Sequence, residues 1–154
     1  MRGIEGHTEL GYCVTALLDV PADRAFDFLA DPVSLGTWSL GCMRVETPNP
    51  QGPYTGFSLY DDSQVWFDIA AYRELLLIDY RVGEIGDLKQ RISVRIVRGE
   101  TCELSNTQCY VSLIAWRPAT MTHDRWTQLC TAHEAEIWLI KARIEAKAGS
   151  NPET

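Results

Sequence analysis

One histidine is the residue of this chain best placed to do acid–base chemistry. It lies in the segment 121–147, where one helical stripe is formed by Trp126, Leu129, Cys130, His133, Ile137, Ile140 and Ile144. An imidazole in the middle of an inward-facing stripe can act as a general acid or base near pH 7. The alternative for His133 is a structural role, as a half-buried side chain hydrogen-bonded to a strand backbone or to water.

Tyr80 is the second candidate catalytic residue. Alternation in the segment 75–82 places it on the same face as Leu76, Ile78 and Val82. A phenol on that face could donate a hydrogen bond to a carbonyl or enolate oxygen of a ligand. The alternative is a core aromatic ring whose hydroxyl group reaches the mouth of a cavity.

The candidate ligand-binding residues are large side chains of the same strands and helix. They are Trp38, Tyr60, Phe67, Ile78, Tyr110, Trp126, Leu129 and Ile137. Tyr60 and Tyr110 are the weaker phenols, because both faces of their strands carry apolar residues. Tryptophan rings around an opening would suit an aromatic ligand, and ordinary core packing is the alternative for each ring taken singly.

Metal, phosphate and serine-nucleophile sites lack their usual patterns. The three histidines do not form an HExxH motif, and His133 and Glu134 are adjacent, so they point about 100° apart on a helix. No GxSxG elbow or phosphate-cradling glycine pattern occurs. The sequence therefore predicts neither a metal nor a cofactor.

Composition predicts one globular domain in a reducing compartment. The chain has 154 residues and a net charge of −7, which disfavours a nucleic-acid partner because phosphate contacts need clustered bases. The five cysteines are odd in number and form no CxxC pair, so we read them as free thiols. No apolar stretch reaches the ~20 residues of a membrane span, and the start of the chain has no signal-like apolar core. These features favour the cytoplasm.

The order of elements predicts an α+β fold. A strand at 11–19 precedes Pro21 and a helix at 22–30, and Asp31 then caps a second short helix that ends near Gly36. Strands follow at 42–47, 54–60, 64–72, 75–82, 90–97 and 107–116, and the long helix closes the chain. We expect one domain over 11–148, with flexible segments at 1–10 and 149–154.

Alternation also assigns the polar faces of the strands. The outer face should carry Asp68, Asp79, Arg81, Arg91 and Arg95, paired across strands in water. Trp66 falls on that same face, and an exposed tryptophan there could anchor a homodimer. A tryptophan that covers the polar ladder is the alternative.

The stretch 14–40, VTALLDVPADRAFDFLADPVSLGTWSL, resembles the START/Bet v 1-like (SRPBCC) superfamily, which includes polyketide cyclases and dehydratases. A strand, a proline, a short aromatic helix, Asp-Pro and a tryptophan come before a run of strands and one amphipathic helix. The resemblance implies a helix-grip fold, a curved antiparallel sheet of about seven strands around the C-terminal helix, with an apolar cavity. It also places Trp38 near the cavity entrance.

The resemblance implies a small hydrophobic ligand, aromatic or polyketide-like, held in the internal cavity. An enzyme of this kind would be a cofactor-independent cyclase, dehydratase or lyase, with His133 moving a proton and Tyr80, together with Tyr110, steadying an oxyanion. The alternative is a non-catalytic carrier or sensor with the same cavity. A third reading is an interaction module that uses Trp66 and the outer face.

Overall fold

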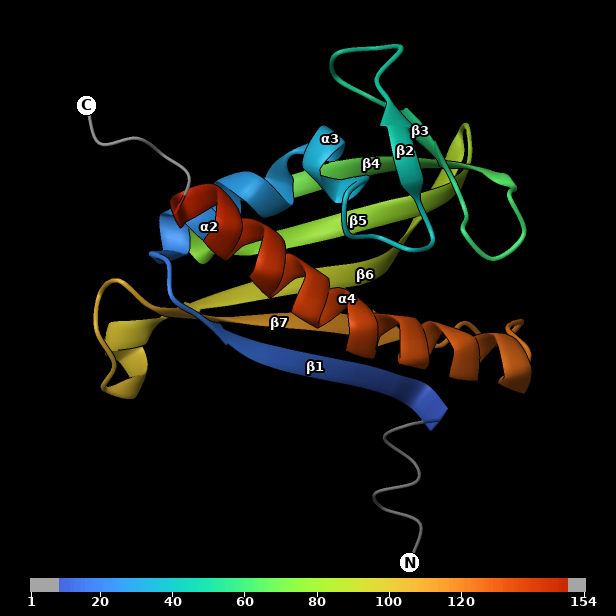
Figure 1. The fold of residues 1–154 in the computed structure, drawn as a ribbon. Helices are drawn as coiled ribbons and strands as arrows, with labels where there is room; N and C mark the ends of the chain where they lie inside the picture. Colours follow the sequence, from blue (N-terminus) through green and yellow to red (C-terminus); the bar gives the residue numbers. More distant parts are fainter. Residues whose placement is uncertain (1–8, 150–154) are drawn as a thin grey trace, which may run out of the picture.

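A seven-stranded antiparallel sheet is the largest element of the structure, a computed structural model that describes residues 9–149 (Figure 1). Its strands are β1 (Gly11–Leu18), β2 (Met43–Glu46), β3 (Tyr54–Phe57), β4 (Gln64–Tyr72), β5 (Leu77–Glu84), β6 (Asp87–Arg98) and β7 (Cys109–Trp116). Their order in the sheet is β1-β7-β6-β5-β4-β3-β2. The first strand along the chain, β1, therefore pairs with the last, β7.

Three helices accompany the sheet. They are α2 (Ala22–Ala30), α3 (Pro32–Leu35) and α4 (His123–Gly149), and two short 3-10 turns cover Arg73–Leu75 and Gly99–Cys102. Helix α4 runs across one face of the sheet over β1 and β7, and α2 and α3 lie near its C-terminal end (Figure 1). This arrangement confirms the predicted α+β helix-grip fold. No helix within residues 9–149 has the length and apolar character needed to cross a bilayer.

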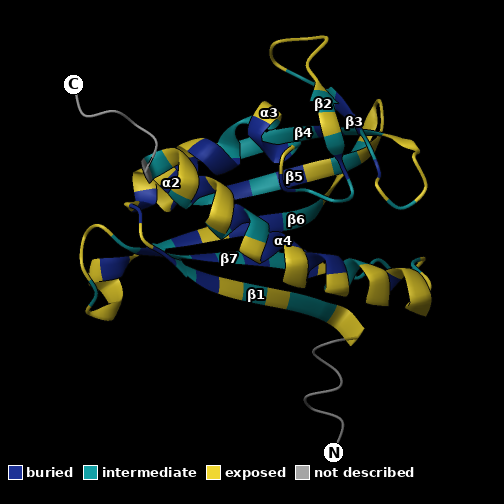
Figure 2. Ribbon diagram, viewed as in Figure 1, coloured by how far each residue is buried: buried dark blue, intermediate teal, exposed yellow. Residues whose placement is uncertain are grey.

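The core lies between the sheet and the helices. Its fully buried side chains include Leu18, Leu29, Phe67, Ile78, Ile96, Leu113, Ile140 and Ile144. Figure 2 shows buried and exposed residues alternating along α4, as expected for a helix with one face against a sheet. Trp126, His133 and Ile137 of the predicted stripe are buried, whereas Leu129 and Cys130 are half-buried.

Local signals in the sequence explain where the helices begin. Asp31 caps α3 as predicted, since its carboxylate accepts hydrogen bonds from the backbone N–H groups of Val33 and Ser34, each at 3.3 Å. Thr122 Oγ1 accepts from the backbone N–H of Arg125 at 3.2 Å at the start of α4. Residues 1–8 and 150–154, most of the segments predicted to be flexible, lie outside the described residues.

A β-bulge in β6 overturns one predicted face. Tyr80 pairs with Ile92, but the next residue, Arg81, pairs with Gln90, so Arg91 is an extra residue in β6. Strict alternation placed Arg91 on the outer face, and the structure instead places it in the wall of an internal pocket. The predicted pairing of charged side chains across strands is observed between β4 and β5, where Arg81 Nε lies 2.6 Å from Asp68 Oδ1.

The tryptophan predicted to be exposed is half-buried. Trp66 lies opposite Thr55 on one side and Gly83 on the other, so it has strand neighbours to cover. The exposed tryptophans are instead Trp116 and Trp138, the latter with 62% of its surface accessible. The homodimer therefore stays a prediction, without an exposed Trp66 to support it.

Helix α4 also bonds to the outer edge of β1. Lys141 Nζ donates to the carbonyl oxygen of Leu17 at 2.7 Å, and Glu145 Oε1 accepts from the backbone N–H of Asp19 at 3.0 Å. Lys141 and Glu145 also contact each other at 2.6 Å. The helix is thus fixed to the edge strand by polar contacts as well as by its apolar face.

Candidate functional site

A pocket of about 220 Å³ lies between α4 and the concave face of the sheet. Its apolar wall includes Val65, Val82, Ile92 and Leu129, from three strands and the helix. Its polar groups are the side chains of Tyr60, Arg91, His133 and Glu136, with Arg125 also in the wall. A mostly apolar hollow with a few polar groups is the usual form of a small-molecule site.

His133 faces this pocket from the middle of α4. Only 2% of its surface is accessible, and its Nδ1 has no hydrogen-bond partner. Burial lowers the pKa of His133 to about 4, so the imidazole is neutral near pH 7. His133 therefore supplies a neutral ring nitrogen without a hydrogen-bond partner beside the pocket.

Glu136 lies one helical turn after His133. It is 4% exposed, and its Oε2 accepts a hydrogen bond from the backbone N–H of Leu40 at 3.1 Å. Burial raises the pKa of Glu136 to about 8, although the hydrogen bonds from Leu40 and Ser39 act in the opposite direction. The carboxyl group is therefore mostly protonated near pH 7 and able to donate a proton.

These two side chains form a neutral acid–base pair. His133 Nε2 lies 3.8 Å from Glu136 Oε1. Because burial opposes the charged form of both groups, we read this contact as one between neutral groups rather than as an ion pair. The pocket thus holds a proton acceptor and a proton donor side by side.

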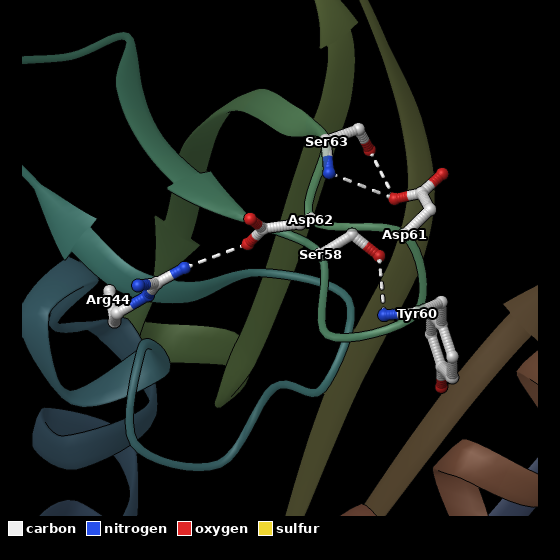
Figure 3. A network of polar contacts seen from close by, with 6 residues as sticks. All are labelled: Arg44, Ser58, Tyr60, Asp61, Asp62 and Ser63. Atoms are coloured by element: carbon white, nitrogen blue, oxygen red, sulfur yellow. Dashed lines mark hydrogen bonds and ion pairs between the residues drawn. The ribbon is translucent and has the colours of Figure 1, made fainter.

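Tyr60 approaches the pocket from the loop between β3 and β4. Figure 3 shows this loop held by its own polar contacts, in which Ser63 donates to Asp61 and Arg44 pairs with Asp62. The Tyr60 hydroxyl is buried without a hydrogen-bond partner, and the Arg125 guanidinium stacks over its ring at 5.2 Å. Burial raises the pKa of Tyr60, and the nearby Glu136 acts in the same direction.

The structure brings three of the predicted site residues into the pocket wall. These are His133, Leu129 and Tyr60. Two further residues were not anticipated. Glu136 follows His133 at i,i+3 spacing, a signal that was present in the sequence. Arg91 depends on a bulge that strict alternation does not reveal.

The other predicted site residues lie outside this pocket wall. The Tyr80 hydroxyl donates to the carbonyl oxygen of Leu29 at 2.7 Å, and Trp38 packs edge-on against the Tyr80 ring at 6.0 Å. Phe67, Ile78, Trp126 and Ile137 are buried, and Tyr110 alternates with the buried residues of β7. Tyr80 is therefore bonded to the backbone of α2 rather than directed at the hollow.

Within residues 9–149, no three His, Cys, Asp or Glu side chains are grouped closely enough to hold a metal ion. Cys42 lines the pocket, but burial raises the pKa of its thiol to about 12, which makes the thiolate rare at neutral pH.

Comparison with known proteins finds similarity at the level of structure. No family model and no curated protein matches the sequence. The Zhui aromatase/cyclase from Streptomyces sp. R1128 superposes with a TM-score of 0.65 at 14% identity, over 94% of this chain and 98% of that one. A START superfamily protein from Mycobacterium smegmatis gives 0.64 at 9% identity, over 90% and 99% of the two chains.

A di-domain aromatase/cyclase, BexL from the BE-7585A biosynthetic pathway, gives a TM-score of 0.65 at 12% identity. The match covers 92% of this chain and 48% of BexL, so this chain corresponds in length to about half of that protein. Identities this low establish the fold and not the reaction. The chain has a START-like helix-grip fold, which it shares with these aromatase/cyclase structures.

Proposed function

We propose that this protein binds a small, hydrophobic, ring-bearing molecule in the pocket under α4 and performs acid–base chemistry on a carbonyl group of that molecule. The observation that carries the proposal is the buried pair of His133 and Glu136, one able to accept a proton and the other to donate one. The aromatase/cyclase names of two structural neighbours support cyclisation or dehydration as the reaction.

A dehydration can be written with these two residues alone. His133 Nδ1 takes the proton from the carbon next to the carbonyl, and Glu136 gives its proton to the hydroxyl group on the following carbon. The C–O bond breaks, a C=C bond forms, and water leaves. The resulting imidazolium and carboxylate face each other across 3.8 Å, and transfer of the Nε2 proton to Glu136 leaves both groups neutral. The proton that remains on His133 Nδ1 then returns to Nε2 by exchange with water, which restores Nδ1 as the acceptor for the next cycle.

Exchange of α-protons tests the first step without knowledge of the natural substrate. We would follow deuterium uptake by 2-tetralone, a bicyclic ketone, by NMR in D₂O. His133→Ala and Glu136→Gln should each lower the protein-catalysed rate by about 10²–10⁴-fold. The rate should fall below pH ~4, where His133 becomes protonated, and above pH ~8, where Glu136 ionises.

The matched control is His123→Ala, which removes an exposed histidine at the start of the same helix. Its exchange rate should equal that of the wild type. An unchanged rate in His133→Ala would contradict the proposed role of the pair.

A non-catalytic carrier is the second candidate. The observation in its favour is the hydrogen bond from Leu40 to Glu136, because holding the 39–42 loop is a structural task for that carboxyl group. A carrier would bind 2-tetralone, seen as broadened ligand signals, with no exchange above the buffer rate. It would keep its affinity within a few-fold in His133→Ala.

A further inference from the structure

The wall of the pocket carries more positive than negative charge. Arg91 and Arg125 both line it, and guanidinium groups stay protonated in proteins. The facing titratable groups are His133, Glu136 and Tyr60, and burial favours the neutral form of each. A positive hollow is notable in a chain whose net charge is −7.

Arg91 has no counter-ion among the described residues. Its guanidinium makes no hydrogen bond and no ion pair with any of them, Glu136 included. Two acids of the neighbouring strands have partners of their own, since Asp68 pairs with Arg81 and Asp79 accepts from Ser93. Arg91 is nonetheless half-buried, because the bulge turns it inward.

A guanidinium in a pocket wall with no acid paired to it attracts an anion more strongly than one in open water does. The apolar wall of Val65, Val82 and Ile92 lies beside Arg91 in the same pocket. The Tyr60 hydroxyl also lacks a partner and could donate to an anionic oxygen. The pocket therefore offers an apolar surface for a ring and a positive, donor-rich group for a negative charge.

We propose that the ligand carries a carboxylate on its apolar ring system and that Arg91 selects for this charge. The proposal rests on the proposed binding of a ring-bearing molecule in this pocket and specifies the class of that molecule. A guanidinium can hold a carboxylate through two parallel N–H donors, which gives orientation as well as attraction. Arg91 would thereby fix which end of the ligand faces the His133–Glu136 pair.

Calorimetric titration with two matched probes tests the selection. The probes are 2-naphthoate and 2-naphthalenemethanol, which share the ring system and differ in the charged group. The wild type should bind 2-naphthoate at least about tenfold more tightly than the alcohol. Arg91→Gln should weaken 2-naphthoate by roughly 10- to 100-fold and change the alcohol by less than about threefold.

Two further variants separate charge from packing. Arg91→Lys keeps the cation and should retain most of the preference for 2-naphthoate. Arg95→Gln removes an exposed arginine of the same strand and should bind both probes as the wild type does. This pair distinguishes a specific role of Arg91 from a general loss of positive charge.

The outcomes distinguish this inference from the function on which it rests. Equal wild-type affinity for the two probes, or equal weakening of both by Arg91→Gln, would overturn the selection and leave ring binding intact. Binding of neither probe by the wild type would overturn the proposed ring binding and the selection with it.

Discussion

At the scale of single residues, the pocket holds two groups whose pKa values are displaced in opposite directions. Burial lowers the pKa of His133 from 6.5 to about 4 and raises that of Glu136 from 4.5 to about 8. Both shifts have the same cause, because removal from water penalises whichever form is charged. The result is a wide pH range in which the acid keeps its proton and the base lacks one.

Glu136 should therefore make the fold less stable as the pH rises from 6.5 to 8. In this window the folded chain keeps the Glu136 proton, whereas the unfolded chain has lost it and holds no extra proton on His133, so unfolding releases a proton. Glu136→Gln resembles the protonated acid and removes this effect. Its free energy of unfolding should gain roughly 2 kcal/mol relative to the wild type across the window, since one pKa unit is worth about 1.4 kcal/mol.

Urea denaturation at several pH values measures this difference. Glu46→Gln, which changes an exposed acid of β2, is the control and should differ from the wild type by a constant amount. A constant difference for Glu136→Gln as well would mean that the carboxyl group is ionised in the folded protein.

Sequence patterns predicted single residues unevenly. His133 was found because it interrupts an apolar helical stripe, and the structure places it against the pocket. Glu136 was missed because a charged residue beside Ile137 looks like the border of that stripe. Its burial depends on the 39–42 loop, which supplies the Leu40 hydrogen bond and lies far from it in sequence.

At the scale of elements, two short helices follow β1 and lead the chain to the opposite edge of the sheet, where β2 lies. The α3 helix has one turn, so much of its stability depends on Asp31 at its start. The Asp31 carboxylate bonds to the backbone N–H groups of Val33 and Ser34, and also accepts from the Ser34 hydroxyl at 2.7 Å. The cap thereby sets where the chain turns toward Trp38.

Asp31→Ala should lower the free energy of unfolding by about 1 kcal/mol, because it leaves backbone donors of α3 without an acceptor. Asp31→Asn keeps an oxygen at the same position, so its free energy of unfolding should fall by at most a few tenths of the loss expected for Asp31→Ala. Thermal denaturation followed by circular dichroism measures both variants. Equal loss in the two variants would point to the charge of Asp31, rather than its capping bond, as the stabilising factor.

Most elements were predictable because their signals are local. The start of α2 is marked by Pro21, and its end and the start of α3 are marked by Asp31-Pro32. Turn residues mark the ends of several strands. The bulge in β6 has no such signal, since it arises from the pairing of Arg81 with Gln90 across the β5–β6 hairpin. The extra residue of a bulge departs from the alternation of its neighbours, so Arg91 could not be placed from alternation alone.

At the scale of the whole molecule, the sheet joins the two ends of the described chain. Val14 lies opposite Leu113, and α4 then packs back onto β1. These contacts form only when nearly the whole chain is in place, so we expect neither end to fold alone. Folds rich in such distant contacts form slowly, in milliseconds to seconds, and as a unit.

Unfolding in urea should accordingly be one cooperative transition. The five tryptophans report on separate elements, since Trp38 follows α3, Trp66 lies in β4, Trp116 in β7, and Trp126 and Trp138 in α4. Their fluorescence and the far-ultraviolet circular dichroism should give one midpoint. Two separate midpoints would show that one part of the fold unfolds apart from the rest.

The contacts of Lys141 and Glu145 with β1 have a consequence for association between molecules. A strand at the border of a sheet exposes unpaired backbone groups that can recruit a strand from another chain and start an aggregate. At Leu17 and Asp19 these groups are already bonded to α4 side chains. Foreign strand addition at this end of β1 would first have to detach the helix, so the contacts that fasten α4 also guard the protein against fibril growth there.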